Sequence, residues 1–300
     1  MNLKEGISIK LRREGHDPFI DYLKGICILF VVLNHCITSE LANNTLFCLW
    51  GSSAVPIFLI IQVFHAFKKG INHVTINYKK MWQRIIWPFL LTEMFIISIY
   101  YLKQVIFGDT SSSPFFKTVL LWGGIGPGCY YPWIYIQFAF LIPIAANVFK
   151  IIKGLNLLII FLTVSTIIEI ICANMIPMRI YRLLFLRYLF LFYLGYILTF
   201  RGFIVNYYTT ILAIGGMAAT LLFFYTEIYI YPFTHHKISI CNWICYLYIA
   251  FGFLWFLKWS HHYIKLCYPI ERSLQWMGIH SYDIFLCQMV FFALLDLYRT

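Results

Sequence analysis

One apolar run near the amino terminus organises the chain, and it reads Asp21-Tyr-Leu-Lys24-Gly-Ile-Cys-Ile-Leu-Phe-Val-Val-Leu-Asn-His35. Lys24 and His35 stand about three helical turns apart, so a helix places both on one face. Asp21 falls near that face as well. An ionisable residue inside a bilayer is costly and is usually retained for function. A histidine that only hydrogen-bonds a neighbouring helix would have the same pattern, so both interpretations stay open at this point.

The composition around this run is that of a membrane protein. Hydrophobic residues make up 61% of the 300 residues and charged residues only 12%, which is too little charge for the surface of a soluble domain. Apolar segments of about 20 residues, the length that crosses a bilayer, recur throughout the chain. We therefore predict an all-α, polytopic transmembrane bundle of about nine helices. Their expected ranges are about 20–38, 46–67, 85–106, 131–149, 155–173, 183–200, 206–226, 240–258 and 276–297.

The polar segments between these runs predict the organisation of the chain. Residues 1–18 form a basic leader, and residues 19–300 form one membrane domain. Lysines and arginines gather between alternate apolar runs, which favours a cytoplasmic amino terminus. That distribution also argues against nucleic acid as the reason for a net charge of +11. The longest gap, 107–130, contains an apolar piece from Phe115 to Trp122 that we expect to dip back into the membrane.

Few side chains within the predicted helices can do acid–base chemistry. The acids are Glu93, Glu169 and Asp283, and His35 is the one histidine placed well inside a helix core. A neutral imidazole suits proton abstraction from a hydroxyl, and Glu93 would orient it or accept the proton. The same two residues would also serve as the proton relay of a transporter. Histidines at helix ends are expected at the membrane interface, and no spacing matches a metal site, so no metal is expected.

Several motifs taken together resemble those of the membrane-bound acyltransferase 3 family. The first is a basic residue followed by ten residues and a histidine in the first helix, here Lys24 and His35. The others follow in order along nearly the whole chain. They are Gly51-Ser-Ser-Ala-Val-Pro-Ile-Phe58, Lys80-Met-Trp-Gln-Arg84-Ile-Ile-Trp-Pro88, Gly126-Pro-Gly-Cys-Tyr-Tyr-Pro-Trp133 with Gln137, Arg187-Tyr-Leu-Phe190 to Gly195, and Gly278 to Gln288.

The resemblance implies an enzyme that moves an acetyl or other short acyl group from acyl-CoA to a hydroxyl of a cell-envelope glycan. His35 would be the catalytic residue, as a general base or a transient acyl carrier. Arg84, with Lys80 behind it, would bind the CoA phosphates. Lys24 would lie at the same cytoplasmic opening of the site, beneath His35. The partners would be acyl-CoA, a carbohydrate or lipid-linked glycan, and the lipids of a bacterial plasma (inner) membrane.

The chain departs from the family at three places. Met81 stands where a first arginine is frequent, and Gln288 where a histidine is frequent. The family usually has ten helices and nine are expected here, so either the chain is short of its last helix or it is an atypical member. Two roles also have plainer alternatives, since Arg84 fits the orientation of a cytoplasmic loop and Trp133 fits an aromatic belt as well as a sugar-binding platform. The rival function is a proton-coupled transporter or exporter of lipid-linked sugars or small metabolites.

Overall fold

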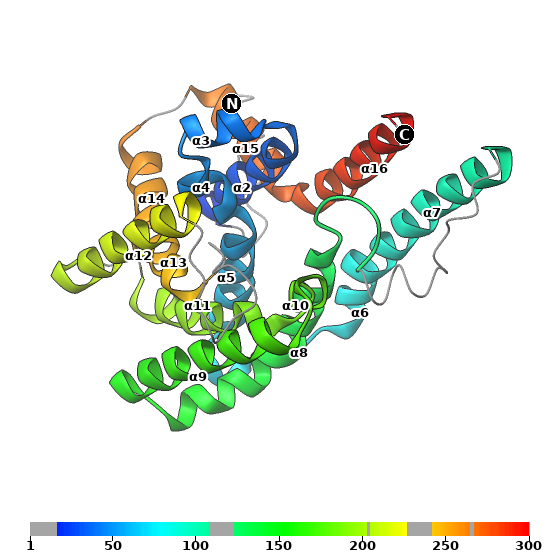
Figure 1. Cartoon of the computed structure of the whole chain (residues 1–300). Helices are drawn as coiled ribbons and strands as arrows, with labels where there is room; N and C mark the ends of the chain where they lie inside the picture. Colours follow the sequence, from blue (N-terminus) through cyan, green and yellow to red (C-terminus); the bar gives the residue numbers. More distant parts are fainter. Residues whose placement is uncertain (1–16, 108–122, 203–204, 227–241, 265–266, 300) are drawn as a thin grey trace, which may run out of the picture.

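The described part of the molecule is a bundle of helices. The computed structural model describes residues 17–107, 123–202, 205–226, 242–264 and 267–299. Every regular element within those ranges is a helix (Figure 1). Seven of these helices are long and apolar enough to cross a bilayer, and a bent pair near the carboxyl terminus would make an eighth. The predicted all-α polytopic bundle is confirmed. Most of the predicted leader and the apolar piece from Phe115 to Trp122 lie outside the described residues.

Most predicted segments correspond to one described helix or to consecutive helical elements. The elements of the first half are α2 (Pro18–Cys36), α3 (Ser39–Asn44), α4 (Phe47–Trp50), η1 (Gly51–Ser53), α5 (Ala54–Phe67), η2 (Ile71–His73), α6 (Tyr78–Met81), the π-helical η3 (Trp82–Ile86) and α7 (Trp87–Phe107). Those of the second half are α8 (Tyr130–Ile151), α9 (Gly154–Met175), α10 (Met178–Tyr181), η5 (Phe185–Tyr188), α11 (Phe190–Arg201), α12 (Tyr207–Tyr225), α13 (Trp243–Tyr248), the π-helical η6 (Ile249–Phe253), α14 (Leu254–Tyr263), α15 (Tyr268–Ile279) and α16 (Ser281–Arg299). The largest differences from prediction fall at the third, sixth and ninth segments, and the eighth ends later than expected, at Tyr263.

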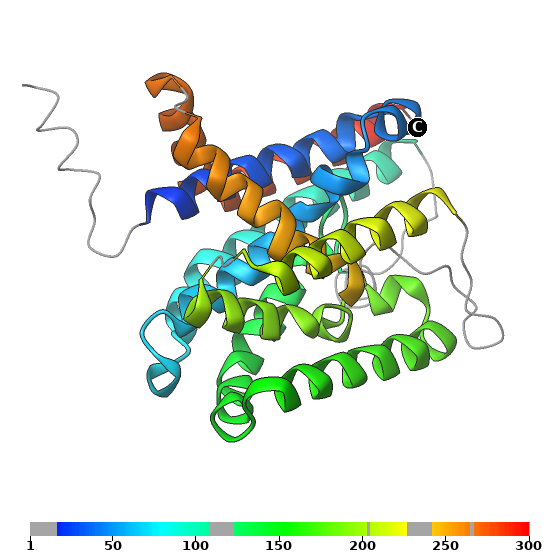
Figure 2. The same ribbon diagram turned by 90° about the vertical axis from the view of Figure 1, so that its left-hand side faces the viewer.

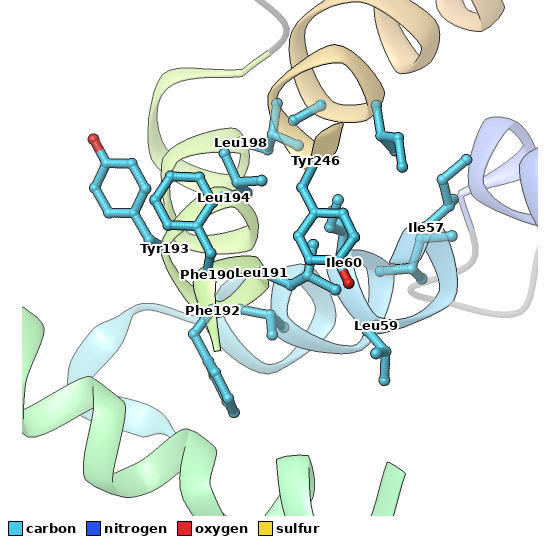
Figure 3. Packing of buried hydrophobic residues seen from close by; sticks show 14 of the residues in the cluster. Ile57, Leu59, Ile60, Phe190, Leu191, Phe192, Tyr193, Leu194, Leu198 and Tyr246 are labelled. Atoms are coloured by element: carbon cyan, nitrogen blue, oxygen red, sulfur yellow. The ribbon is translucent and has the colours of Figure 1, made fainter. Parts of the chain in front are cut away.

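Buried hydrophobic side chains fill the contact between α5 and α11 (Figure 3). Ile60 of α5 and Phe190 and Leu194 of α11 belong to one buried cluster, each at most 3% exposed. Gly195 allows the close approach, because a Cβ at this position would lie 2.6 Å from the Cβ of Val63. Lipid surrounds apolar side chains as favourably as protein does, so dense packing at small residues is what drives two membrane helices together.

The sixth predicted segment is α-helical only in its second part, after the short 3-10 helix η5. Regular α-helix begins at Phe190, and the 12 residues of α11 are too few to cross a bilayer alone. The cause is the amide of Gln137 in α8, whose Nε2 donates to the Leu183 carbonyl at 2.6 Å and whose Oε1 accepts from the Phe185 N–H at 3.0 Å. A side chain from another helix therefore pairs backbone groups that a continuing helix would have paired internally.

Two further segments differ from prediction at their ends. The third helix begins at Tyr78, earlier than expected, and contains the π-helical turn Trp82–Ile86. The ninth is broken, since α15 ends at Ile279, α16 begins at Ser281, and the chain bends by 77° between them. After the bend, α16 packs on both α2 and α7 (Figures 1 and 2).

The position of α15 is set by two glycines at its contact with α2. A Cβ at Gly25 of α2 would overlap the backbone carbonyl of Leu274, and a Cβ at Gly278 of α15 would overlap that of Asp21. Two backbones in direct contact leave no room for any side chain at these positions. The last turn of α15 is therefore fixed on the first half of α2, and α16 begins from that point.

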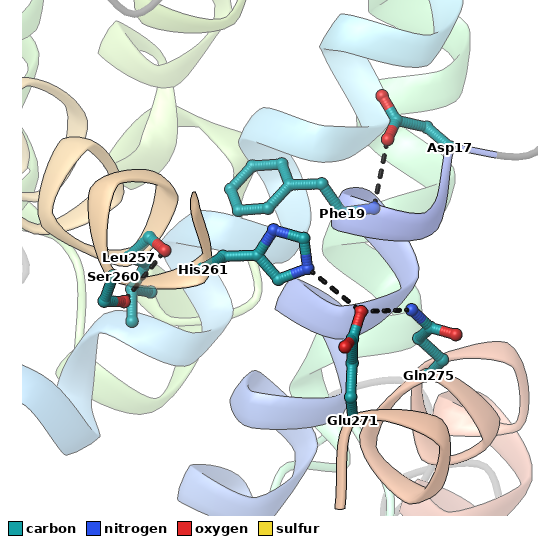
Figure 4. A network of polar contacts seen from close by, with 7 residues as sticks. All are labelled: Asp17, Phe19, Leu257, Ser260, His261, Glu271 and Gln275. Atoms are coloured by element: carbon teal, nitrogen blue, oxygen red, sulfur yellow. Dashed lines mark hydrogen bonds and ion pairs between the residues drawn. The ribbon is translucent and has the colours of Figure 1, made fainter. Parts of the chain in front are cut away.

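A polar contact ties α14 to α15 beside the beginning of α2 (Figure 4). His261 Nε2 lies 3.5 Å from Glu271 Oε1, and Gln275 Nε2 donates to the same oxygen at 3.2 Å. The His261 ring also packs on Phe19 and Tyr22, with ring centroids 5.4 and 4.7 Å apart. His261, in the last turn of α14, thus contacts both α15 and α2.

Candidate functional site

One large cavity, of about 2030 Å³, runs along α2. Its lining extends from Asp17, just before α2, to His35 in the last turn. A helix rises about 27 Å over that distance, close to the thickness of a hydrocarbon core, about 30 Å. The other walls come mainly from α5, the basic segment 74–88, the loop 124–129, the first half of α8 and the break between α15 and α16. Four of the six predicted site residues line this cavity: Lys24, His35, Lys80 and Arg84.

His35 occupies one end of the cavity and is half-buried. Its ring packs on Phe292 of α16, with centroids 5.5 Å apart. Within the described part of the chain, its ring nitrogens make no hydrogen bond, so they are available to a ligand. Asn34 and Ser52 add polar side chains to the lining. This end therefore offers a base together with groups that can hydrogen-bond a hydroxylated substrate.

The other end of the cavity is cationic. Lys24 Nζ lies 3.4 Å from the Asp21 carboxylate one turn earlier on α2. Lys80 in α6 and Arg84 in η3 are both exposed. π-Helical turns are rare and frequently mark functional positions. A ligand with several phosphates would find charge-assisted hydrogen bonds at this end. Two more cations in the lining follow α5 in sequence: Lys68 and Lys69.

Glu93 and Trp133, the other predicted site residues, lie behind the cavity wall and do not line it. Glu93 is 0% exposed, and its Oε2 accepts a hydrogen bond from the Ile125 N–H at 2.9 Å. Trp133 Nε1 donates to the Gly123 carbonyl at 2.9 Å. Gly124, with φ of 122°, allows this approach because a Cβ there would overlap the Glu93 carboxylate. Both side chains thus hold the loop that forms one wall of the cavity.

This contact predicts different effects for two substitutions of Glu93. Glu93→Ala is expected to lower the thermal stability, since it leaves the Ile125 N–H unpaired at a cost of about 1–3 kcal/mol. Glu93→Gln keeps an acceptor oxygen and is expected to melt near the native protein. Melting of the purified protein in detergent is the measurement, with the exposed Glu40→Ala as the control. Equal losses in the Ala and Gln variants would instead assign the effect to the charge. No contact between Glu93 and His35 is present among the described residues, so their catalytic partnership stays a prediction.

Several polar groups of the lining were not predicted as site residues, and two of them have notable chemistry. At the helix break, His280 Nδ1 lies 3.2 Å from Asp283 Oδ2, and both residues line the cavity. In the sequence, the acid three residues after His280 is the pattern that could have indicated this pair. Cys129 also lines the cavity, and burial, with Glu93 adding to it, raises the pKa of its thiol to about 12. Cys129 therefore stays a thiol at neutral pH and is a poor nucleophile.

Comparison with known proteins leaves the interpretation to the site itself. The chain matches none of the protein-family models, curated proteins or solved structures with which it was compared. Among the described residues, no group of three or more histidine, cysteine or acidic side chains is placed to hold a metal ion.

Proposed function

We propose that this chain is an integral membrane acyltransferase of the bacterial plasma membrane, which moves an acetyl or other short acyl group from acyl-CoA to a hydroxyl of a cell-envelope glycan. One observation carries the proposal: a single cavity holds an imidazole available to a ligand at one end and a cationic group at the other. Lys24 and His35 lie on one helix, about 16 Å apart along its axis. A long donor with phosphates at one end and a thioester at the other fits both groups together.

In the proposed reaction, His35 takes the proton from the acceptor hydroxyl. The hydroxyl oxygen attacks the thioester carbonyl, a C–O ester bond forms, and the C–S bond breaks. The departing CoA sulfur takes up the proton that His35 held, so the imidazole ends in the state in which it began. Lys80 and Arg84 bind the phosphates of the donor. Holding both substrates in one cavity removes much of the entropic cost of their encounter.

The direct test of the proposal is the covalent product. Purified protein in lipid nanodiscs is incubated with isotope-labelled acetyl-CoA and a panel of envelope glycans, and the glycans are analysed by mass spectrometry before and after mild base. A base-labile gain of labelled acetyl on a glycan supports the proposal. Free CoA without an acylated glycan, or no reaction across the panel, counts against it.

The length of the cavity favours a second candidate, a proton-coupled transporter or exporter of lipid-linked sugars or small metabolites. A lining that extends from Asp17 to His35 covers nearly the depth of a bilayer, as a transport path must. Proteoliposomes with a pH gradient separate the two candidates. A transporter moves its cargo across the membrane without changing it covalently, and it does so without acyl-CoA.

Arg84→Ala is expected to raise the acyl-CoA concentration that gives half-maximal activity roughly tenfold to a hundredfold, since a charge-assisted hydrogen bond contributes about 1.5–3 kcal/mol. The rate at saturating donor is expected to change little. Initial rates against acyl-CoA concentration provide the measurement. Lys79→Ala is the matched control, because Lys79 is exposed on α6 next to Lys80 and does not line the cavity. An unchanged dependence in Arg84→Ala would remove Arg84 from the donor site.

A further inference from the structure

A hydrogen bond joins the break between α15 and α16 to the cationic end of the cavity. The Tyr282 hydroxyl donates to the Ile85 carbonyl at 2.8 Å, across 197 residues of sequence. Both residues line the cavity. Among the described residues, this is the hydrogen bond that links α16 to η3. It therefore connects the last part of the chain to the turn that carries Arg84.

The turn that carries Arg84 is held differently from an ordinary helical turn. The backbone N–H of Trp87 bonds to the Trp82 carbonyl, five residues back, where an α-helix would use the fourth. Arg84 lies within this π-helical turn and is exposed. A long exposed side chain has many rotamers of similar energy, so the direction of its guanidinium depends on the orientation of the backbone turn beneath it. Ile85, whose carbonyl Tyr282 holds, is the next residue.

We infer that Tyr282 is a positioning residue for Arg84. By holding the Ile85 carbonyl, Tyr282 fixes the orientation of the π-helical turn. That orientation sets the direction in which the Arg84 guanidinium enters the cationic end of the cavity, where the donor phosphates would bind. The inference rests on the proposed function, since it assigns Tyr282 a part in binding the phosphates of acyl-CoA. Tyr282 acts through Arg84 and does not itself need to touch the donor.

The helix break explains how Tyr282 reaches this position. Gly278 lies directly against the Asp21 carbonyl, which fixes the last turn of α15 on α2. The bend of 77° follows, and Tyr282 is the second residue of α16. The first turn of α16 consequently faces the same cavity as the basic segment. One hydroxyl thus ties the cationic end of the cavity to α16, and α15 in turn lies against α2, the helix that carries Lys24.

The test compares acyl transfer by Tyr282→Phe and by the native protein in nanodiscs. Loss of the hydroxyl is expected to raise the KM for acyl-CoA roughly threefold to tenfold, as for one neutral hydrogen bond, and to leave kcat within about twofold, because binding rather than chemistry is affected. Since Tyr282 acts through Arg84, the double variant Tyr282→Phe/Arg84→Ala is expected to have the KM of Arg84→Ala alone. A tyrosine with a merely structural role would lower the amount of active protein and leave the KM unchanged.

Tyr225→Phe is the matched control for the loss of a hydroxyl. The Tyr225 hydroxyl also donates to the backbone of a distant segment, the Asn43 carbonyl at 2.9 Å, and neither residue lines the cavity. Its KM is expected to equal that of the native protein. An unchanged KM in Tyr282→Phe, or KM increases that multiply in the double variant, would overturn the inference.

Binding of ADP, a probe with two phosphates and no acyl group, separates this inference from the proposed function. Weaker ADP binding by Tyr282→Phe but not by Tyr225→Phe supports the positioning role, even where no glycan is acylated. Equal ADP binding by all three proteins overturns it. Acyl transfer that fails in the native protein while ADP binds overturns the proposed function alone, and a native protein that binds neither ADP nor acyl-CoA overturns both.

Discussion

His35→Ala is expected to abolish acyl transfer and to leave the amount of folded protein in the membrane unchanged. A general base contributes about 10²–10⁴-fold to a rate, and alanine has no group that accepts the proton. The imidazole is half-buried and its described ring contact is with Phe292, so its removal leaves the packing of α2 largely intact. The measurement is the rate of glycan acylation at saturating acyl-CoA, with the size-exclusion profile as the check on folding.

Two companion variants make this result specific to His35. His262→Ala is the matched control, since His262 is exposed on α14 and does not line the cavity. His35→Gln keeps a polar side chain of similar length but cannot act as a base, so it is also expected to be inactive. Normal acylation by His35→Ala would contradict the mechanism. Activity in His35→Gln but not in His35→Ala would assign His35 a role in hydrogen bonding rather than in proton transfer.

The predicted site residues that share the cavity are those whose positions follow from a regular pattern. Lys24 and His35 could be placed on one face because a helix has a constant rise and period. Lys80 and Arg84 could be placed at one end because cations collect where apolar runs stop on the cytoplasmic side. Glu93 was assigned on residue type alone. Hydropathy shows that a polar side chain is buried but not which way it points, and Glu93 points to the loop at Ile125.

The helix boundaries that were missed depend on contacts between distant segments. A hydropathy window counts apolar residues and predicts helix from 183, but it contains no information about Gln137, which pairs the Leu183 carbonyl and the Phe185 N–H. The break near His280 likewise depends on contact of Gly278 with α2. The hydrogen bond of Tyr282 with Ile85 follows from that break. Local patterns therefore predicted most of the membrane helices, and long-range contacts determine the details of the cavity wall.

Gly278→Ala is expected to be strongly destabilising. The added Cβ would overlap the Asp21 carbonyl oxygen and lie 3.0 Å from the Gly25 nitrogen. Both atoms belong to helix backbone and cannot rotate away as the end of a side chain can, so α15 has to move off α2. Overpacking usually costs about 1–3 kcal/mol, and more where backbone shifts. The melting temperature of the purified protein in detergent is therefore expected to fall by about 2–10 °C.

The same substitution is expected to weaken donor binding at the cationic end of the cavity. A displaced α15 carries the helix break with it and disturbs the bond of Tyr282 to Ile85, so Gly278→Ala is expected to raise the KM for acyl-CoA in the protein that remains folded. Gly215→Ala in α12 is the matched control, because an added Cβ there has no atom within 4 Å and alanine favours helix over glycine. If Gly278→Ala has the melting temperature and the KM for acyl-CoA of the native protein, the contact of α15 with α2 is not what holds Tyr282 at the cationic end of the cavity.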